Sequence, residues 1–251
     1  MAVKKVIRDA FLIAWLKSIP DLKRQPLILV LLTALSAIPL FFIVLFGGSG
    51  MLNAGLVGVI VSSIGFIGIS ASIQDLTWDR YVKLREMVVA MPVSSISYSI
   101  GITLGFLIFA LPGFLLFMGF GVYRGMFDLT GLLLTFGAMA LCWLGLAVIG
   151  FTIATYQQKA SPNTLGIWAN LLSFLFVFLP PVYYPKEMLS QYGMSWIAYL
   201  LPTSNAAEII RYLTEQTAWD QTSYMYHWIA LVVTVIIFAI LVVKKARWRE
   251  P

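Results

Sequence analysis

Charged side chains that could pair or dock are concentrated in two segments of this sequence. Residues 74–96 contain six of them: Asp75, Asp79, Arg80, Lys83, Arg85 and Glu86. Farther along the chain, Glu208 and Arg211 stand three residues apart, a spacing that places both on one face of a helix. Because a carboxylate and a guanidinium on one helical face attract each other, Glu208 and Arg211 can form an ion pair; a surface loop in which both charges are hydrated is the alternative.

Motifs for nucleotide or metal chemistry are absent from the sequence. It contains no Gly-Lys pair, so it has no P-loop to hold phosphates. One histidine, His227, cannot build a His-based metal site, and we expect it to be an interfacial residue. The single Cys142 lies in an apolar run and is expected to be an inert thiol. We therefore expect no catalytic residue, no metal and no cofactor in this chain.

Three neutral polar residues in apolar runs could line a path for a substrate: Ser62, Asn170 and Ser173. Asn170 is central in its run and would be the costliest to bury. An interhelical hydrogen bond explains it as well as a substrate path does, and the sequence leaves both open. Ala54, Gly58 and Ser62 form a stripe at a spacing of four, which favours close helix packing within the chain or between two copies.

The elements that must position these residues follow from composition. Of the 251 residues, 60% are hydrophobic and 11% are charged, against roughly 25% charged in an ordinary soluble protein. Six segments without Asp, Glu, Lys or Arg are long or nearly long enough to cross a bilayer. The sequence thus predicts an all-α membrane protein forming one transmembrane domain over residues 1–251. The six expected spans are residues 27–46, 51–73, 97–120, 130–154, 164–180 and 226–243.

Orientation follows from the basic residues. With the N-terminus inside, 14 of the 17 Lys and Arg residues fall on the inner side and 3 on the outer side. We therefore expect a multi-pass protein of the cytoplasmic membrane with both termini cytoplasmic. The net charge of +6 sits at the ends of apolar runs, so nucleic acid is not an expected partner.

Three further elements are expected outside the spans. Residues 3–17 have apolar residues at helical spacing and predict an amphipathic helix on the membrane surface, which Pro20 and Pro26 separate from the first span; a disordered basic tail is the alternative. Residues 79–89 predict a cytoplasmic helix that docks on a soluble partner, although a solvated loop fits equally well. Residues 184–214 predict an outer re-entrant segment of two short helices broken near Pro202.

Three sequence segments resemble the ABC-2-type transporter permeases, the membrane subunits of ATP-driven exporters. Glu86-Met-Val-Val-Ala-Met-Pro92-Val-Ser94 is similar to the loop after the second span of that family, although Lys83-Leu84 stands where many members have Gly-Thr. Tyr184-Pro185-Lys186-Glu187-Met188 resembles the stretch outside the fifth span. The segment from Trp196 to Arg211, with its Pro202, Glu208 and Arg211, resembles the outer signature and is the most specific of the three.

The resemblance implies roles that the residues alone do not supply. It implies a permease that pairs with a second copy or a homologous permease, in contact with membrane lipid. Two ABC ATPase subunits would bind ATP and Mg and drive export. Asp79, Arg80, Lys83, Arg85 and Glu86 would couple to the ATPases, and Pro202, Glu208 and Arg211 would form an outer gate. The alternative function is a polytopic membrane enzyme or assembly factor that acts on lipid.

Overall fold

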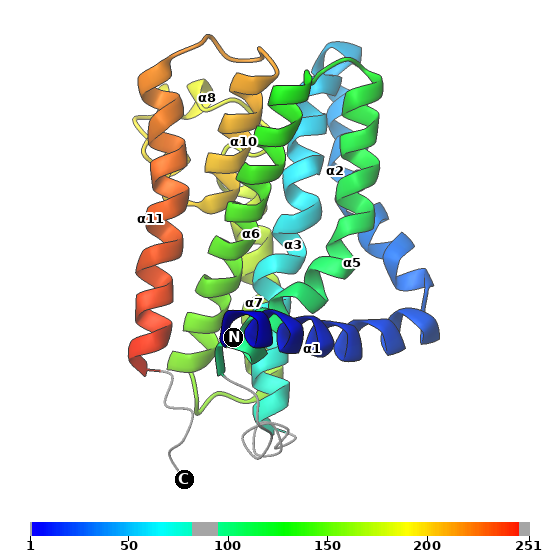
Figure 1. Ribbon diagram of the computed structural model, residues 1–251. Helices are drawn as coiled ribbons and strands as arrows, with labels where there is room; N and C mark the ends of the chain where they lie inside the picture. The colour runs from blue at the N-terminus through cyan, green and yellow to red at the C-terminus, as the bar shows by residue number, and fades with distance from the viewer. Residues whose placement is uncertain (1, 82–94, 246–251) are drawn as a thin grey trace.

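The computed structural model describes residues 2–81 and 95–245, and these parts of the chain are helical, with no β-strand among them. Six helices run along a common axis (Figure 1). They are α2 (Leu27–Gly47), α3 (Leu52–Tyr81), α5 (Ser95–Tyr123), α6 (Leu129–Tyr156), α7 (Pro162–Phe178) and α11 (Gln221–Lys245). The start of α1 and the end of α11 lie at the same end of this bundle (Figure 1).

Five of the six axial helices are long and apolar enough to cross a membrane, namely α2, α3, α5, α6 and α11. The prediction of a multi-pass membrane protein is confirmed at this level. The sixth, α7, is 17 residues long, about 26 Å at 1.5 Å per residue, and is shorter than the roughly 30 Å hydrocarbon core. A sixth crossing therefore remains a prediction.

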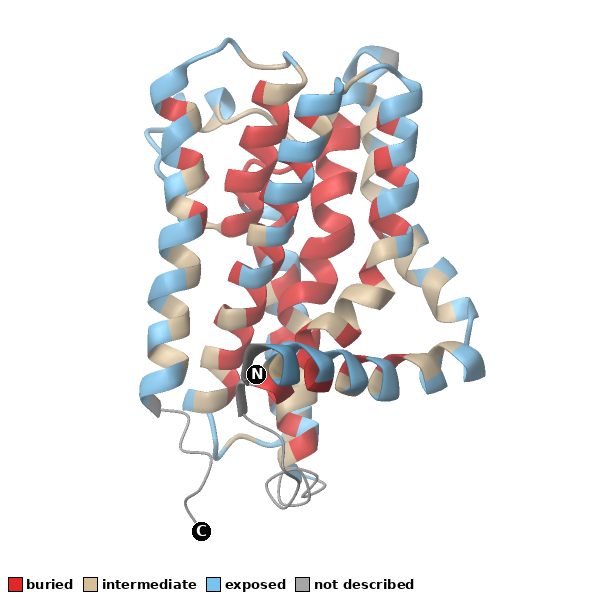
Figure 2. Cartoon of the chain, viewed as in Figure 1, coloured by how far each residue is buried: buried red, intermediate tan, exposed pale blue. Residues whose placement is uncertain are grey.

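Helix α3 forms the centre of the bundle (Figure 2). Its residues from Gly55 to Ile69 are all buried, including six glycines and serines that let neighbours approach closely. The helix continues to Tyr81, two turns beyond the expected end at residue 73. Asp75, Asp79 and Arg80 thus lie on the core helix and not in a separate loop, because pairing of the carboxylates with Lys17 allows the helix to continue.

Helix α1 (Ala2–Arg24) lies across the end of the bundle (Figure 1). The expected break at Pro20 is wrong, because the helix continues through Pro20 and ends one turn later. Packing on α5 holds it: a Cβ added to Gly101 would lie 2.9 Å from the carbonyl oxygen of Ala10. The Ser18 hydroxyl also donates to the carbonyl of Gly105 over 2.8 Å. The face toward the bundle is therefore made of small residues.

The segment between α7 and α11 contains three short helices at the other end of the bundle. They are α8 (Glu187–Ser190), α9 (Ile197–Leu200) and α10 (Pro202–Leu213). The predicted break near Pro202 is confirmed, because Leu201 is extended and Pro202 begins α10. Proline suits this first position, since its missing N–H would have no helical partner there. Helix α10 is thereby inserted among the longer helices.

Candidate functional site

The candidate site is built on α10, a helix whose polar residues are buried. All residues from Pro202 to Tyr212 are buried. Five of them are polar or charged and at most 2% exposed: Thr203, Ser204, Asn205, Glu208 and Arg211. Burying a polar group without a hydrogen-bond partner costs free energy. The hydrogen bonds of these five side chains therefore show what holds α10 in place.

Three of these side chains donate to backbone carbonyls near the ends of helices. Ser204 donates to the carbonyl of Ala198 over 2.8 Å. The Asn205 amide donates to the carbonyls of Tyr199 and Leu201 over 3.1 and 2.9 Å. Thr203 donates to the carbonyl of Phe176 in α7. The last carbonyls of a helix have no partner within that helix, so α10 caps the end of α9 and binds α7.

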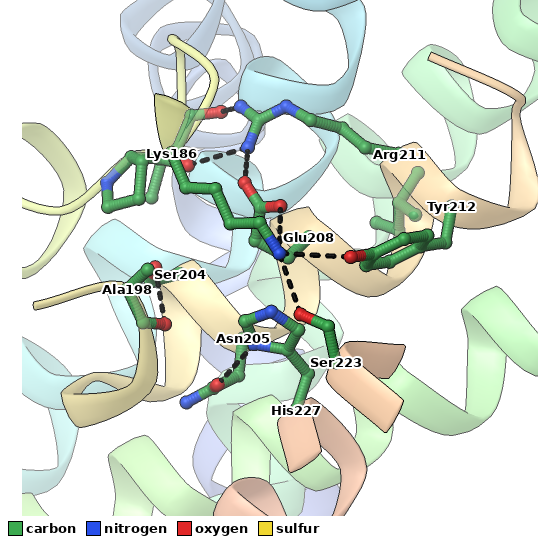
Figure 3. Close-up of polar contacts among 12 residues, drawn as sticks. Lys186, Ala198, Ser204, Asn205, Glu208, Arg211, Tyr212, Ser223 and His227 are labelled. Carbon is green, nitrogen blue, oxygen red and sulfur yellow. Dashed lines mark hydrogen bonds and ion pairs between the residues drawn. The ribbon is translucent and has the colours of Figure 1, made fainter. Parts of the chain in front are cut away.

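An ion cluster lies at the far end of α10 (Figure 3). The Arg211 guanidinium donates to the Glu208 carboxylate over 2.5 Å, which confirms the predicted pair. It also donates to the carbonyls of Pro181 and Val182 over 2.8 and 2.6 Å. One arginine thus holds both the carboxylate and the turn that follows α7.

Lys186 approaches the same carboxylate from the other side (Figure 3). Its ammonium lies 3.9 Å from the second oxygen of Glu208 and donates to the hydroxyls of Tyr212 and Ser223 over 2.9 and 2.7 Å. Burial raises the pKa of Glu208, while the charges of Arg211 and Lys186 act to lower it. The carboxylate is thus enclosed by two cations, an arrangement that suits a structural clamp better than acid–base catalysis.

The single histidine joins this cluster from α11. His227 is 0% exposed, so the expectation of an interfacial position is wrong. Its Nδ1 lies 2.8 Å from the Asn205 side-chain oxygen, and its ring stacks on Tyr199 at 4.6 Å between centroids. The Tyr212 ring of α10 also lies 6.3 Å from the His227 ring between centroids. His227 therefore links α9, α10 and α11.

A second polar cluster lies at the opposite end of the bundle, where α1 crosses α3. The Lys17 ammonium donates to Asp75 and Asp79 over 2.6 and 2.7 Å. The Tyr98 hydroxyl of α5 donates to the same Asp79 carboxylate. Three helices therefore meet at Asp79, one turn before α3 ends.

The residues predicted to couple to an ATPase fall partly within this cluster. Asp79 belongs to it, and Arg80 donates to the carbonyl of Ala154 in α6 over 3.2 Å. Lys83, Arg85 and Glu86 lie outside the described residues, as does most of the predicted docking helix 79–89. Their role stays a prediction.

The three residues proposed for a substrate path are not brought together. Ser62 is buried and accepts a hydrogen bond of 2.7 Å from Tyr183. Ser173 is buried and donates to the carbonyl of Ala169 in its own helix. Asn170 is exposed and accepts from Gln74 over 3.4 Å. Because Gln74 lies 12 residues beyond Ser62 on α3, about 18 Å along the helix, Ser62 and Asn170 belong to different levels of the bundle.

Tyr183 explains the stripe of small residues on α3. A Cβ on Gly58 would lie 2.1 Å from the Tyr183 ring, so the ring occupies the space that glycine leaves. The same ring stacks on Phe178 at 5.7 Å. At Gly58 and Ser62 the stripe therefore serves packing within one chain.

Sequence reasoning missed two cations that complete these clusters, Lys17 and Lys186. Both were counted as flanking charges that fix orientation. Their partners are distant in the sequence: Lys17 and Asp79 are separated by 62 residues. No local signal identifies Lys17 as the partner of Asp75 and Asp79, because Arg80, Lys83 and Arg85 are nearer in the sequence.

No group of three or more metal-binding side chains occurs among residues 2–81 and 95–245. The comparisons with known proteins add no relative: no family model matches the chain, and no curated protein matches it. The site is therefore characterised by its geometry, which is that of two polar clusters at opposite ends of an apolar helical bundle.

Proposed function

We propose that the chain is the permease subunit of an ATP-driven exporter, with the energy supplied by separate ATPase subunits. The observation that carries this proposal is the burial of α10, a polar helix that enters the bundle and does not cross it. Its 12 residues extend about 18 Å, well short of the roughly 30 Å hydrocarbon core. The resemblance of residues 196–211 to the outer signature of ABC-2-type permeases supports the same function.

In this proposal α9 and α10 close the outer end of an export path. Irregular backbone is tolerated at membrane depth when protein buries it and satisfies its polar groups. The bonds from Ser204, Asn205 and Arg211 to backbone carbonyls meet this requirement. Opening the outer end of the path would break these hydrogen bonds, and the freed groups would need other partners. These bonds therefore define the closed state.

The opposite end receives the driving force. Chain segments before and after residues 82–94 are anchored there, since α3 ends at Tyr81 and α5 begins at Ser95. The cluster around Asp79 ties α1, α3 and α5 together at the same level. An ATPase whose two nucleotide states bind this chain with different affinity could therefore bias the positions of three helices through one contact.

Membrane placement completes the proposal. Six crossings, with α7 as the fifth, would put both termini in the cytoplasm and α10 toward the outside. The basic residues in α1 and at the end of α11 support this orientation.

The test is purification of the tagged chain from its own membrane, followed by ATP hydrolysis measurements. We expect a P-loop ATPase to co-purify in equal amount and to hydrolyse ATP, whereas the chain produced alone hydrolyses none. Charge reversal of Arg80, Lys83 and Arg85 to Glu should release the ATPase while the chain remains in the membrane. Purification without any P-loop ATPase, or an ATPase retained fully by the reversed variant, would contradict the proposal.

A further inference from the structure

A cavity of about 710 Å³ lies between α1, the start of α2, α3 and α5. This volume is within the range of roughly 300–1,000 Å³ that small-molecule sites occupy. Its lining is divided by chemistry. Lys17, Asp21 and Arg24 of α1 supply charges at one side, while Ile28 and Leu32 of α2 and Phe106 and Phe109 of α5 supply an apolar wall. A ligand that fills it must therefore have a polar and an apolar part.

The charges that remain for a ligand are one cation and one anion. Lys17 is engaged by Asp75 and Asp79 at 2.6 and 2.7 Å. Asp21 and Arg24 are exposed, and neither side chain has a partner among residues 2–81 and 95–245. They stand three residues apart on one face of α1. The cavity thus offers a free carboxylate and a free guanidinium side by side.

We infer that this cavity binds a phospholipid whose head group carries a phosphate and a primary ammonium, as in phosphatidylethanolamine. Arg24 binds the phosphate, for which the planar guanidinium is suited. Asp21 accepts a hydrogen bond from the ammonium, and an acyl chain lies against Ile28, Leu32 and the two phenylalanines. The inference requires the chain to lie in a membrane and does not depend on an ATPase.

The position of the cavity fits the level of lipid head groups. Helix α1 lies across the bundle end with Phe11 and Trp15 more than 60% exposed, as expected for a helix in the membrane interface. The cavity lining on α3 extends from Trp78 to Ile67, about 16 Å along the helix toward the bundle centre. A head group at α1 would therefore direct its chain into the apolar part.

Other amphiphiles fit this set of charges less well. An anionic head group would gain Arg24 but face the negative charges of Asp21 and Asp75 in the same lining. A quaternary ammonium has no N–H to donate to Asp21. A free phosphate would leave the apolar wall uncovered. The predicted order of binding is therefore ethanolamine first, then choline and glycerol head groups with the same chains.

Native mass spectrometry of the full chain, purified in detergent, tests this order. Phosphatidylethanolamine, phosphatidylcholine and phosphatidylglycerol with identical acyl chains are titrated, together with glycerophosphoethanolamine, which has the head group and no chains. We expect one phosphatidylethanolamine per chain to bind most tightly. Arg24→Ala and Asp21→Ala should each weaken it about tenfold, the typical effect of losing one charge-assisted hydrogen bond. Lys23→Ala removes an exposed cation that does not line the cavity and should bind as the wild type does.

A second variant tests the apolar part. Ser70 lines the cavity, and Ser70→Phe should occupy part of the space for the acyl chain and weaken lipid binding while Asp21 and Arg24 remain; if it does not fold, the two charge variants decide. Equal binding of all three lipids to all variants would show a nonspecific lipid shell and overturn the inference. Tighter binding of phosphatidylglycerol than of phosphatidylethanolamine would overturn it too, as would glycerophosphoethanolamine binding as tightly as the lipid.

Discussion

The Lys17 ammonium of α1 lies 2.7 Å from the Asp79 carboxylate of α3, so an ion pair joins the crosswise helix to the core helix. The same ammonium lies 2.6 Å from Asp75. One cation therefore serves two carboxylates that would otherwise repel each other.

Removing this cation should loosen α1. We expect Lys17→Ala to lower the free energy of unfolding by about 1–3 kcal/mol, because Asp75 would lose its cation and the buried Asp79 would keep only the Tyr98 hydroxyl. Thermal unfolding in detergent measures the change. Lys23→Ala, which removes an exposed cation of the same helix, is the control. If the two variants unfold alike, the pair contributes nothing to stability.

The outer cluster should behave as a coupled unit. Glu208→Ala leaves Arg211 and Lys186 without their carboxylate, and truncating one member of a buried pair costs about 3–5 kcal/mol. Arg211→Ala should cost more, because it also frees the carbonyls of Pro181 and Val182. The double variant should be milder than the sum of the single ones.

The folded yield and the export activity of these three variants are measured. Glu187→Ala is the control, because Glu187 is exposed on the neighbouring α8. Three variants that match this control would contradict the buried clamp, since exposed pairs contribute little.

The close contact between Gly58 and Tyr183 predicts a strong dependence on size. Gly58→Ala would place a methyl group within 2.1 Å of the ring, and overpacking of this kind costs about 1–3 kcal/mol. In a Tyr183→Ala background the same substitution should be neutral or stabilising. Gly166→Ala in α7 meets nothing within 4 Å and provides the matched control. Equal melting temperatures for Gly58→Ala and the control would show that the ring moves away freely.

The membrane topology can be tested at two exposed positions, one at each end of the bundle. Lys159 lies between α6 and α7 at the end of the bundle where α1 lies, and Ser190 lies in α8 at the other end. In a Cys142→Ser background, we expect Ser190→Cys to react with an impermeant thiol reagent applied outside intact cells, and Lys159→Cys to react after lysis alone. The reverse pattern would invert the proposed orientation.

Local patterns could be predicted from the sequence, and contacts between distant segments could not. The Glu208–Arg211 pair and the break at Pro202 depend on residues within one turn, so spacing was enough. The Lys17–Asp79 pair joins residues 62 positions apart, which no local pattern reveals. The continuation of α1 through Pro20 depends on its packing against glycines of α5. The burial of His227 likewise required knowing that α9 and α10 pack against α11.

The buried polar residues of α10 also constrain the order in which the chain is assembled. A segment containing Asn205, Glu208 and Arg211 partitions poorly into lipid by itself. Its partners come from both sides in the sequence: Pro181 and Val182 are synthesised earlier, whereas His227 is synthesised later. Helix α10 therefore completes its hydrogen bonds only after the start of α11 has been synthesised, so a later helix encloses one made before it.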